Sequence, residues 1–143
     1  MATQNWLGIA TAVSQVTTVT IGTYDATTTY KVTIGGQTIS TLGTGGTNAT
    51  TATALKNLLA ASTHPYFAAV TWTVNSAVIT GTATTAGVPF VLTTAVSSGT
   101  GTISNSTTTA SSGPNDWSTA LNWDSGTVPA AGDNVYIKNT STP

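Results

Sequence analysis

Alternation between apolar and hydroxyl side chains restricts the fold of this chain more than any other feature. In the run Thr28-Thr-Tyr-Lys-Val-Thr-Ile34, every second residue from Tyr30 onward is apolar. Successive side chains of a β-strand point to opposite faces, so we expect one buried face and one wet face. Gly35-Gly36 then supplies a two-residue hairpin turn, and residues 37–42 read as the return strand. The pattern predicts an antiparallel hairpin, which residues 16–21 extend into a meander.

Further runs rich in Val, Ile and Thr predict more strands, and one segment predicts a helix. In residues 50–62, Ala, Leu and Lys replace Thr and Val, with leucines at the i, i+3 and i+4 spacing of a helix ended by Pro65. The order of strands, helix and strands predicts an α+β, mainly β fold. We expect an antiparallel sheet or sandwich of about six to eight strands, with the helix packed on it and an extended C-terminal tail. The remaining predicted strands are residues 69–74, 77–80, 90–96, about 100–107 and 135–138.

Composition along the chain predicts four parts. Residues 1–15 form an N-terminal arm and residues 16–103 form the β-rich module. Residues 104–115, which are nearly all Ser, Thr, Asn and Ala, have the composition of a linker. Residues 116–143 contain Trp but too few apolar residues for a core of their own. We expect this last part to dock on something, to lead into a longer fibre, or to pair with a neighbour.

The scarcity of charge excludes several classes of function. Only 5% of residues are charged, with no Glu and no Arg, and the net charge is −1. Three lysines give no basic stripe for nucleic acid or an anionic membrane. The absence of Cys removes disulfides and thiolate chemistry, and we expect no cofactor and no metal. The N-terminal residues match neither a secretory signal nor a membrane span. A net charge near zero lets copies pack together, which favours an assembly over a monomer.

The few titratable side chains predict no enzyme. A glycosidase would need two carboxyl groups that converge on a substrate. Asp25 and Asp133 lie in turn contexts, where Asp bonds to its own backbone. The single imidazole, His64, stands beside Pro65 and is expected to cap the helix end. Asp116 and Asp124 flank two tryptophans, which leaves an alternative open, a cleft that stacks a carbohydrate on Trp.

Two regions resemble known phage proteins. Residues 30–39, 54–58 and 77–92, above all Ala86-Gly-Val-Pro-Phe90, resemble a module common in tailed-bacteriophage structural proteins, and this resemblance covers about residues 16–98. Residues 116–137, with Trp117, Trp123 and Val128-Pro-Ala-Ala-Gly-Asp133, resemble the segment that leads into right-handed β-solenoids of phage fibres and secreted surface proteins. The resemblance implies an anchoring domain on a virion shell or tail, with no catalytic residues to carry over.

We therefore expect a structural virion protein, a head decoration or head-fibre anchor on the capsid exterior. It would bind copies of itself and other virion proteins such as the major capsid protein, and it would lie on the virion or otherwise outside cells. The first alternative is a tail-fibre or adhesin module that binds host carbohydrate, and the second is a fragment of a polysaccharide depolymerase. Large aromatic residues near flexible ends either contact partners or close the domain's own core. The candidate contact residues are Trp6, Trp117, Trp123 and Tyr136.

Overall fold

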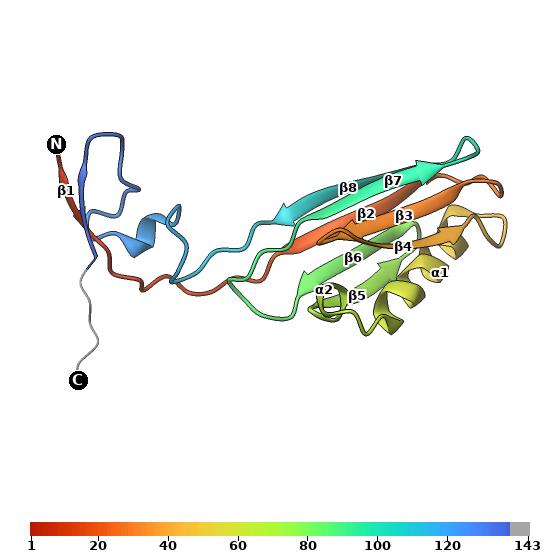
Figure 1. Ribbon diagram of the computed structural model, residues 1–143, viewed down its shortest axis with the longest axis horizontal. Helices are drawn as coiled ribbons and strands as arrows, with labels where there is room; N and C mark the ends of the chain where they lie inside the picture. Colours follow the sequence, from red (N-terminus) through yellow and green to blue (C-terminus); the bar gives the residue numbers. More distant parts are fainter. Residues whose placement is uncertain (138–143) are drawn as a thin grey trace.

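Seven antiparallel strands and one long helix enclose the main core of the protein (Figure 1). The structure is a computed structural model that describes residues 1–137. One sheet has the strand order β5-β6-β2-β8 and the other has the order β4-β3-β7. These sheets form a sandwich, which confirms the predicted mainly β, α+β fold. Its elements are β2 (Val16–Thr23), β3 (Thr29–Ile34), β4 (Gln37–Leu42), α1 (Asn48–Ala61), β5 (Val70–Asn75), β6 (Val78–Ala83), β7 (Leu92–Ser97) and β8 (Thr102–Thr109).

The alternating pattern of β3 determines which side chains enter the core. Tyr30, Val32 and Ile34 are buried, whereas the residues between them remain partly exposed. The hairpin turn at Gly35-Gly36 has positive φ at both residues, as the tight connection between β3 and β4 requires. The predicted hairpin is therefore confirmed over residues 29–42.

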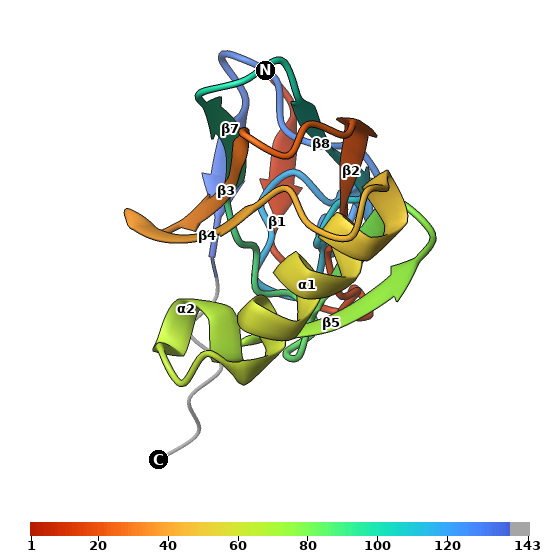
Figure 2. The same ribbon diagram turned by 90° about the vertical axis from the view of Figure 1, so that its right-hand side faces the viewer.

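Helix α1 closes one side of the sandwich, between the edge strands β4 and β5 (Figure 2). Leu55 and Leu59 are fully buried against the strands. On the opposite side, β7 and β8 lie together, and the Asn105 side chain bonds to Thr94 and to the Leu92 carbonyl. Most of the strand edges are thereby covered, as is common in stable β-proteins.

The two ends of the chain meet in a second, smaller structure, which we call the terminal unit (residues 1–10 and 113–137). Its strands β1 (Thr3–Asn5) and β9 (Asn134–Tyr136) pair in parallel, and a short 3₁₀ helix, η1 (Ala120–Asn122), lies between them in sequence. Figure 1 shows this unit at one narrow end of an elongated molecule. The C-terminal segment thus docks on the N-terminal arm of the same chain. Its residues 138–143 lie outside the described residues.

The predicted linker at residues 104–115 is wrong over residues 104–109, which belong to β8. Strand β8 pairs with β2 from Val16 to Thr23, although its side chains are almost all exposed. Its composition resembles that of a linker because backbone hydrogen bonds, rather than apolar side chains, hold it in the sheet. Threonine is β-branched and suits an exposed strand.

Two local predictions also need correction. Strands β2 and β3 belong to different sheets, so residues 16–42 do not form a meander. Pro65 begins a second helix, α2 (Pro65–Ala68), at a position where its missing N–H costs nothing. His64 is consequently the N-cap of α2, with its Nδ1 3.4 Å from the Tyr66 N–H nitrogen, and does not cap the end of α1.

Candidate functional site

Three of the four predicted contact residues form one aromatic cluster in the terminal unit. Trp6 stacks on Trp117 at a centroid distance of 5.9 Å, and both rings meet Trp123 edge-on at 5.0 and 4.5 Å. Trp123 is only 1% exposed, and its Nε1 donates to the Trp117 carbonyl at 3.0 Å. Trp123 is therefore a core residue of the unit, and it is not placed to face a partner.

The other candidates keep exposed surface. Trp117 is 47% exposed and Tyr136 is 55% exposed, while Trp6 is half-buried. Tyr136 lies on β9, away from the aromatic cluster in sequence, and its backbone carbonyl accepts from the Trp6 N–H at 2.9 Å. Of the four candidates, Trp117 and Tyr136 thus present the most aromatic surface to a partner.

Asn122 organises the terminal unit, and the sequence pattern did not single it out. Its fully buried side chain accepts from the Ala10 N–H at 2.9 Å and donates to the carbonyls of Gly113 and Asp116 at 2.7 and 2.9 Å. Its backbone carbonyl accepts from the Leu7 N–H at 2.7 Å. One amide therefore joins both ends of the chain, and a polar residue between the large apolar residues Leu121 and Trp123 was the signal available in sequence.

Two carboxylates tie the chain ends together. Asp124 accepts from the Asn5 backbone N–H at 2.9 Å and from the Asn5 side-chain amide at 2.5 Å. Asp133 accepts from the N–H groups of Ala130 and Ala2, both at 3.0 Å. These donors stabilise the ionised form, so the pKa of Asp124 and the pKa of Asp133 both lie below the ordinary value.

The other two carboxylates hold loops. Asp116 accepts from the Ser118 hydroxyl and N–H, at 2.7 and 3.0 Å, and from the Thr119 hydroxyl at 3.0 Å. Asp25 accepts from the Thr27 hydroxyl and N–H and from the Thr100 hydroxyl, which joins the loop after β2 to the loop after β7. These hydrogen bonds lower the pKa of each carboxyl. All four aspartates of the chain therefore have structural partners.

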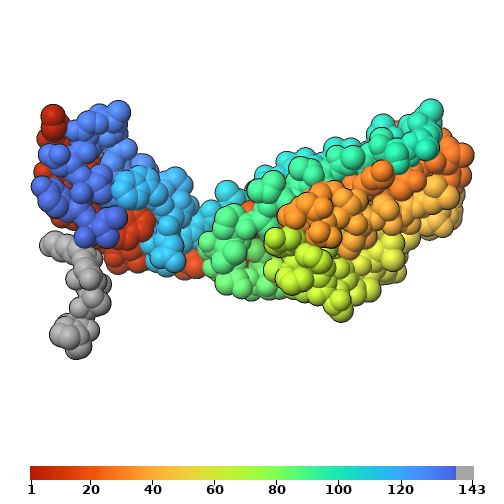
Figure 3. Space-filling view, viewed as in Figure 1, coloured from red at the N-terminus to blue at the C-terminus, as the bar shows by residue number. Residues whose placement is uncertain are grey.

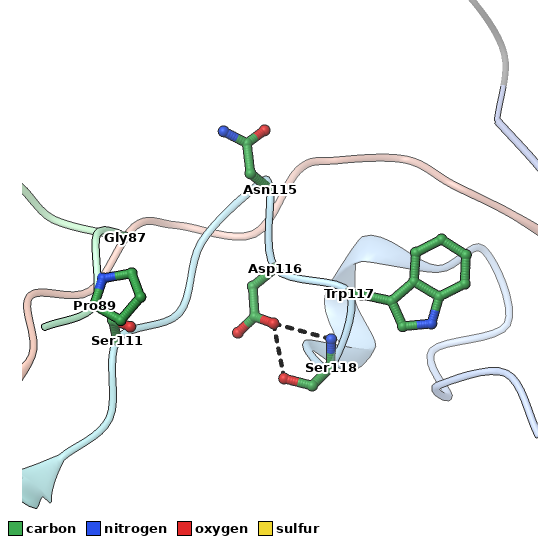
Figure 4. A pocket seen from close by; sticks show the side chains of 7 residues that line it. All are labelled: Gly87, Pro89, Ser111, Asn115, Asp116, Trp117 and Ser118. Atoms are coloured by element: carbon green, nitrogen blue, oxygen red, sulfur yellow. Dashed lines mark hydrogen bonds between the residues drawn. The ribbon is translucent and has the colours of Figure 1, made fainter. Parts of the chain in front are cut away.

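A cleft of about 410 Å³ lies beside Trp117, where the terminal unit meets the sandwich. In Figure 4, the Asp116 carboxylate bonds to Ser118, and the Trp117 ring points away from Gly87 and Pro89. Trp117 is therefore one of the residues that line the cleft. The remaining walls are polar: Ser111, Asn115 and Ser118.

No protein-family model matches the sequence, and no curated protein matches it. Within residues 1–137, no three His, Cys, Asp or Glu side chains come together in an arrangement that could hold a metal ion. No helix in the same part of the chain is long and apolar enough to cross a membrane.

Proposed function

We propose that this protein is a structural component of a tailed-phage virion, a head-decoration or head-fibre anchor on the capsid exterior. The observation that carries the proposal is the terminal unit, in which residues from both ends of the chain form one small structure that exposes several large apolar side chains. Its exposed large apolar side chains range from 41% to 99% exposed: Met1, Leu7, Ile9, Trp117, Leu121, Val128, Tyr136 and Ile137.

Exposed apolar side chains in such number favour a contact surface over a free surface. The rest of the molecule supports the same role, because the outer strand faces carry hydroxyl and amide side chains and few charges. Such a protein acts through shape and self-association, and the resemblance of residues 16–98 to phage structural modules supports this assignment.

Cryo-electron microscopy tests the proposal on particles from the phage that encodes the chain, compared with particles from which its gene is deleted. We expect density for the sandwich on the capsid exterior, absent after deletion and restored by the wild-type protein added in trans. Substitution of Ile9 and Leu121 by Asp should reduce the restored occupancy, whereas Thr73→Asp on the exposed face of β5 should not. Particles with identical density before and after deletion would refute the assignment.

The cleft beside Trp117 favours a second candidate, binding of a host carbohydrate by a tail-fibre or adhesin module. Its volume of about 410 Å³ suits a small ligand, and one exposed indole and several hydroxyl and amide groups border it. Titration with host polysaccharide should shift the NMR resonance of the Trp117 indole. The same titration of the Asn115→Ala variant should produce no shift. If the Trp117 resonance does not shift at saturating polysaccharide, carbohydrate binding is excluded and only the structural role remains. A depolymerase is the weakest candidate, because all four carboxylates already accept hydrogen bonds that hold the fold together.

A further inference from the structure

Two chain segments connect the terminal unit to the sandwich, and a third segment lies against them. The connecting segments are residues 11–15 and 110–112, and they share one antiparallel bridge, between Val13 and Ser112. The third segment, residues 84–91, which we call the strap, joins β6 to β7. In Figure 3, the strap is green and borders the light-blue second connection, at the end of the sandwich that faces the terminal unit. Because a two-stranded ribbon alone is only marginally stable in water, the strap decides how firmly the two parts are joined.

Backbone hydrogen bonds join the strap to both connecting segments. The Gly87 N–H donates to the Val13 carbonyl at 3.0 Å, and the Val13 N–H donates to the Ser112 carbonyl at 2.7 Å. Val13 is thus bonded to the strap through its carbonyl and to the second connection through its N–H. Next to it, Gly113 is buried, and a Cβ there would lie 3.3 Å from the Ala12 Cα and 3.5 Å from the Gly87 Cα. The three backbones therefore pack directly on one another.

Gln15 fixes the strap at both of its ends. The Gln15 side chain is 6% exposed, accepts from the Phe90 N–H at 3.1 Å and donates to the Phe90 carbonyl at 2.6 Å. Its backbone carbonyl accepts from the Ala83 N–H, directly before the strap, at 2.9 Å. A buried amide with all of these bonds made holds one geometry for the segments that it joins.

The hydrogen bonds continue from the connecting segments into the terminal unit. The Asn122 side chain accepts from the Ala10 N–H and donates to the Gly113 carbonyl, and these two residues border the two connections. Pro89 in the strap and Pro114 after the second connection each have a fixed φ, which stiffens the backbone further. Parts of a chain that share only a small interface move relative to one another by default, so this network of bonds is what opposes the motion.

We propose that the strap locks the terminal unit in one orientation relative to the sandwich, and that Gln15 is the residue that fastens the strap. Gly87 and Pro89 of the strap also line the cleft beside Trp117, so the lock keeps this cleft at one width. A cleft that is already formed binds a ligand with a smaller ordering cost. The lock is a property of the free protein and does not depend on a virion.

The distance between two spin labels, one on each part, measures the lock. The chain contains no Cys, so labels attach only where a Cys is introduced. Thr73→Cys, on the exposed face of β5, and Ala131→Cys, exposed in the terminal unit, provide the two positions. We expect double electron–electron resonance to give one narrow distribution of distances. A broad or double-peaked distribution in this doubly labelled protein would overturn the proposal.

Gln15→Met, added to the labelled protein, tests the residue that fastens the strap. Met has a similar length but cannot bond to the Phe90 backbone. We expect the distribution of distances to become at least about twofold broader, because the two parts then move relative to one another. Gln37→Met, the same change at the exposed start of β4, is the matched control and should leave the distribution narrow. An unchanged distribution in Gln15→Met would overturn the role of Gln15.

A second variant decides the matter if Gln15→Met does not fold, which the loss of the NMR signal of Trp72 in the sandwich core would reveal. Pro89→Gly keeps the hydrogen bonds of the strap and frees its backbone at an exposed position. We expect this variant to broaden the distribution of distances while the Trp72 signal is preserved. A distribution as narrow as that of the unsubstituted labelled protein would show that the strap does not hold the orientation.

Discussion

Asn122 stabilises the terminal unit through hydrogen bonds that no apolar residue can replace. Its side chain satisfies one N–H and two carbonyl groups from three separate positions in the chain. The described part of the chain leaves no buried side-chain nitrogen or oxygen without a partner, so the arrangement is complete as it stands. A buried amide of this kind fixes one geometry for the segments around it.

We predict that Asn122→Ala destabilises the terminal unit by about 3 kcal/mol, because it leaves the Ala10 N–H without its partner and opens a small cavity. Hydrogen exchange should show faster exchange in residues 1–10 and 113–137 and unchanged exchange in the sandwich. Asn75→Ala, at the exposed end of β5, is the control and should change neither. Equal protection of the terminal unit in both variants would contradict the role of Asn122.

The two hairpin glycines provide a matched pair of substitutions. Gly35 and Gly36 have φ values of +58° and +80°, but only a Cβ on Gly35 would collide with Tyr66. We expect Gly36→Ala to lower the free energy of unfolding by about 1 kcal/mol, because a residue with a Cβ is strained at positive φ. Gly35→Ala should cost clearly more, because the Tyr66 ring must also move. Urea denaturation of both variants measures this difference in the free energy of unfolding. Equal losses in the two variants would show that the Tyr66 ring moves aside without a loss of stability.

At the scale of elements, β8 shows that a strand can have the composition of a linker. It is held by backbone pairing with β2, together with side-chain bonds such as the one between Thr17 and Thr107. We predict that those amides of residues 104–107 that face β2 are protected at a level close to that of β2, and that protection is lost after Thr109. Exchange at the rate of an unstructured peptide throughout this run would contradict the strand.

The elements that sequence reasoning found are those whose residues carry their own pattern. The alternation in β3, the Gly35-Gly36 turn and the leucine spacing of α1 each depend on neighbours in sequence, so they could be predicted. The assignment of β2 and β3 to separate sheets depends on pairing between residues far apart in the sequence, such as Val19 with Ile79. No pattern among neighbouring residues in the sequence predicts such a pairing.

The same distinction applies to the candidate site. The tryptophans could be selected as large aromatics near the ends, but whether each is buried or exposed follows from the pairing of β1 with β9, which joins the two ends of the chain. Asn122 was missed because its partners, such as the Ala10 N–H, come from distant segments of the chain. The aspartates could be recognised as turn residues at Asp25 and Asp133, where the bonds are partly local.

At the scale of the whole molecule, we expect acid to unfold the terminal unit before it unfolds the sandwich. Three of the four aspartates lie in the terminal unit, and hydrogen bonds hold their pKa values below the ordinary value. Groups with a lowered pKa in the folded state contribute stability above the unfolded pKa of about 3.9, and that stability is lost as the pH falls through the folded pKa. We predict that the terminal unit opens below about pH 4 while the sandwich remains folded.

NMR spectra recorded from neutral pH down to about pH 2 follow the two parts separately. Resonances of Trp6, Trp117 and Trp123 report on the terminal unit, and those of Trp72, in the sandwich core, report on the sandwich. In the Asp133→Asn variant, the terminal unit should be less stable at neutral pH, and its stability should depend less on pH under acidic conditions. Loss of all four tryptophan signals at one pH would show that the two parts unfold together.

The pairing of β1 with β9 also determines how the protein carries a mechanical load. The strands run parallel, so a pull on the start of β1 and the end of β9 slides one strand along the other. The hydrogen bonds of the pair, together with those that Asn5 donates to Asp124 and Ala2 donates to Asp133, then resist as a group and do not break one at a time. The sandwich lies between these strands in sequence and outside the line of force. Tension applied at the start of β1 and the end of β9 therefore reaches the core of the sandwich only after the terminal unit has unfolded.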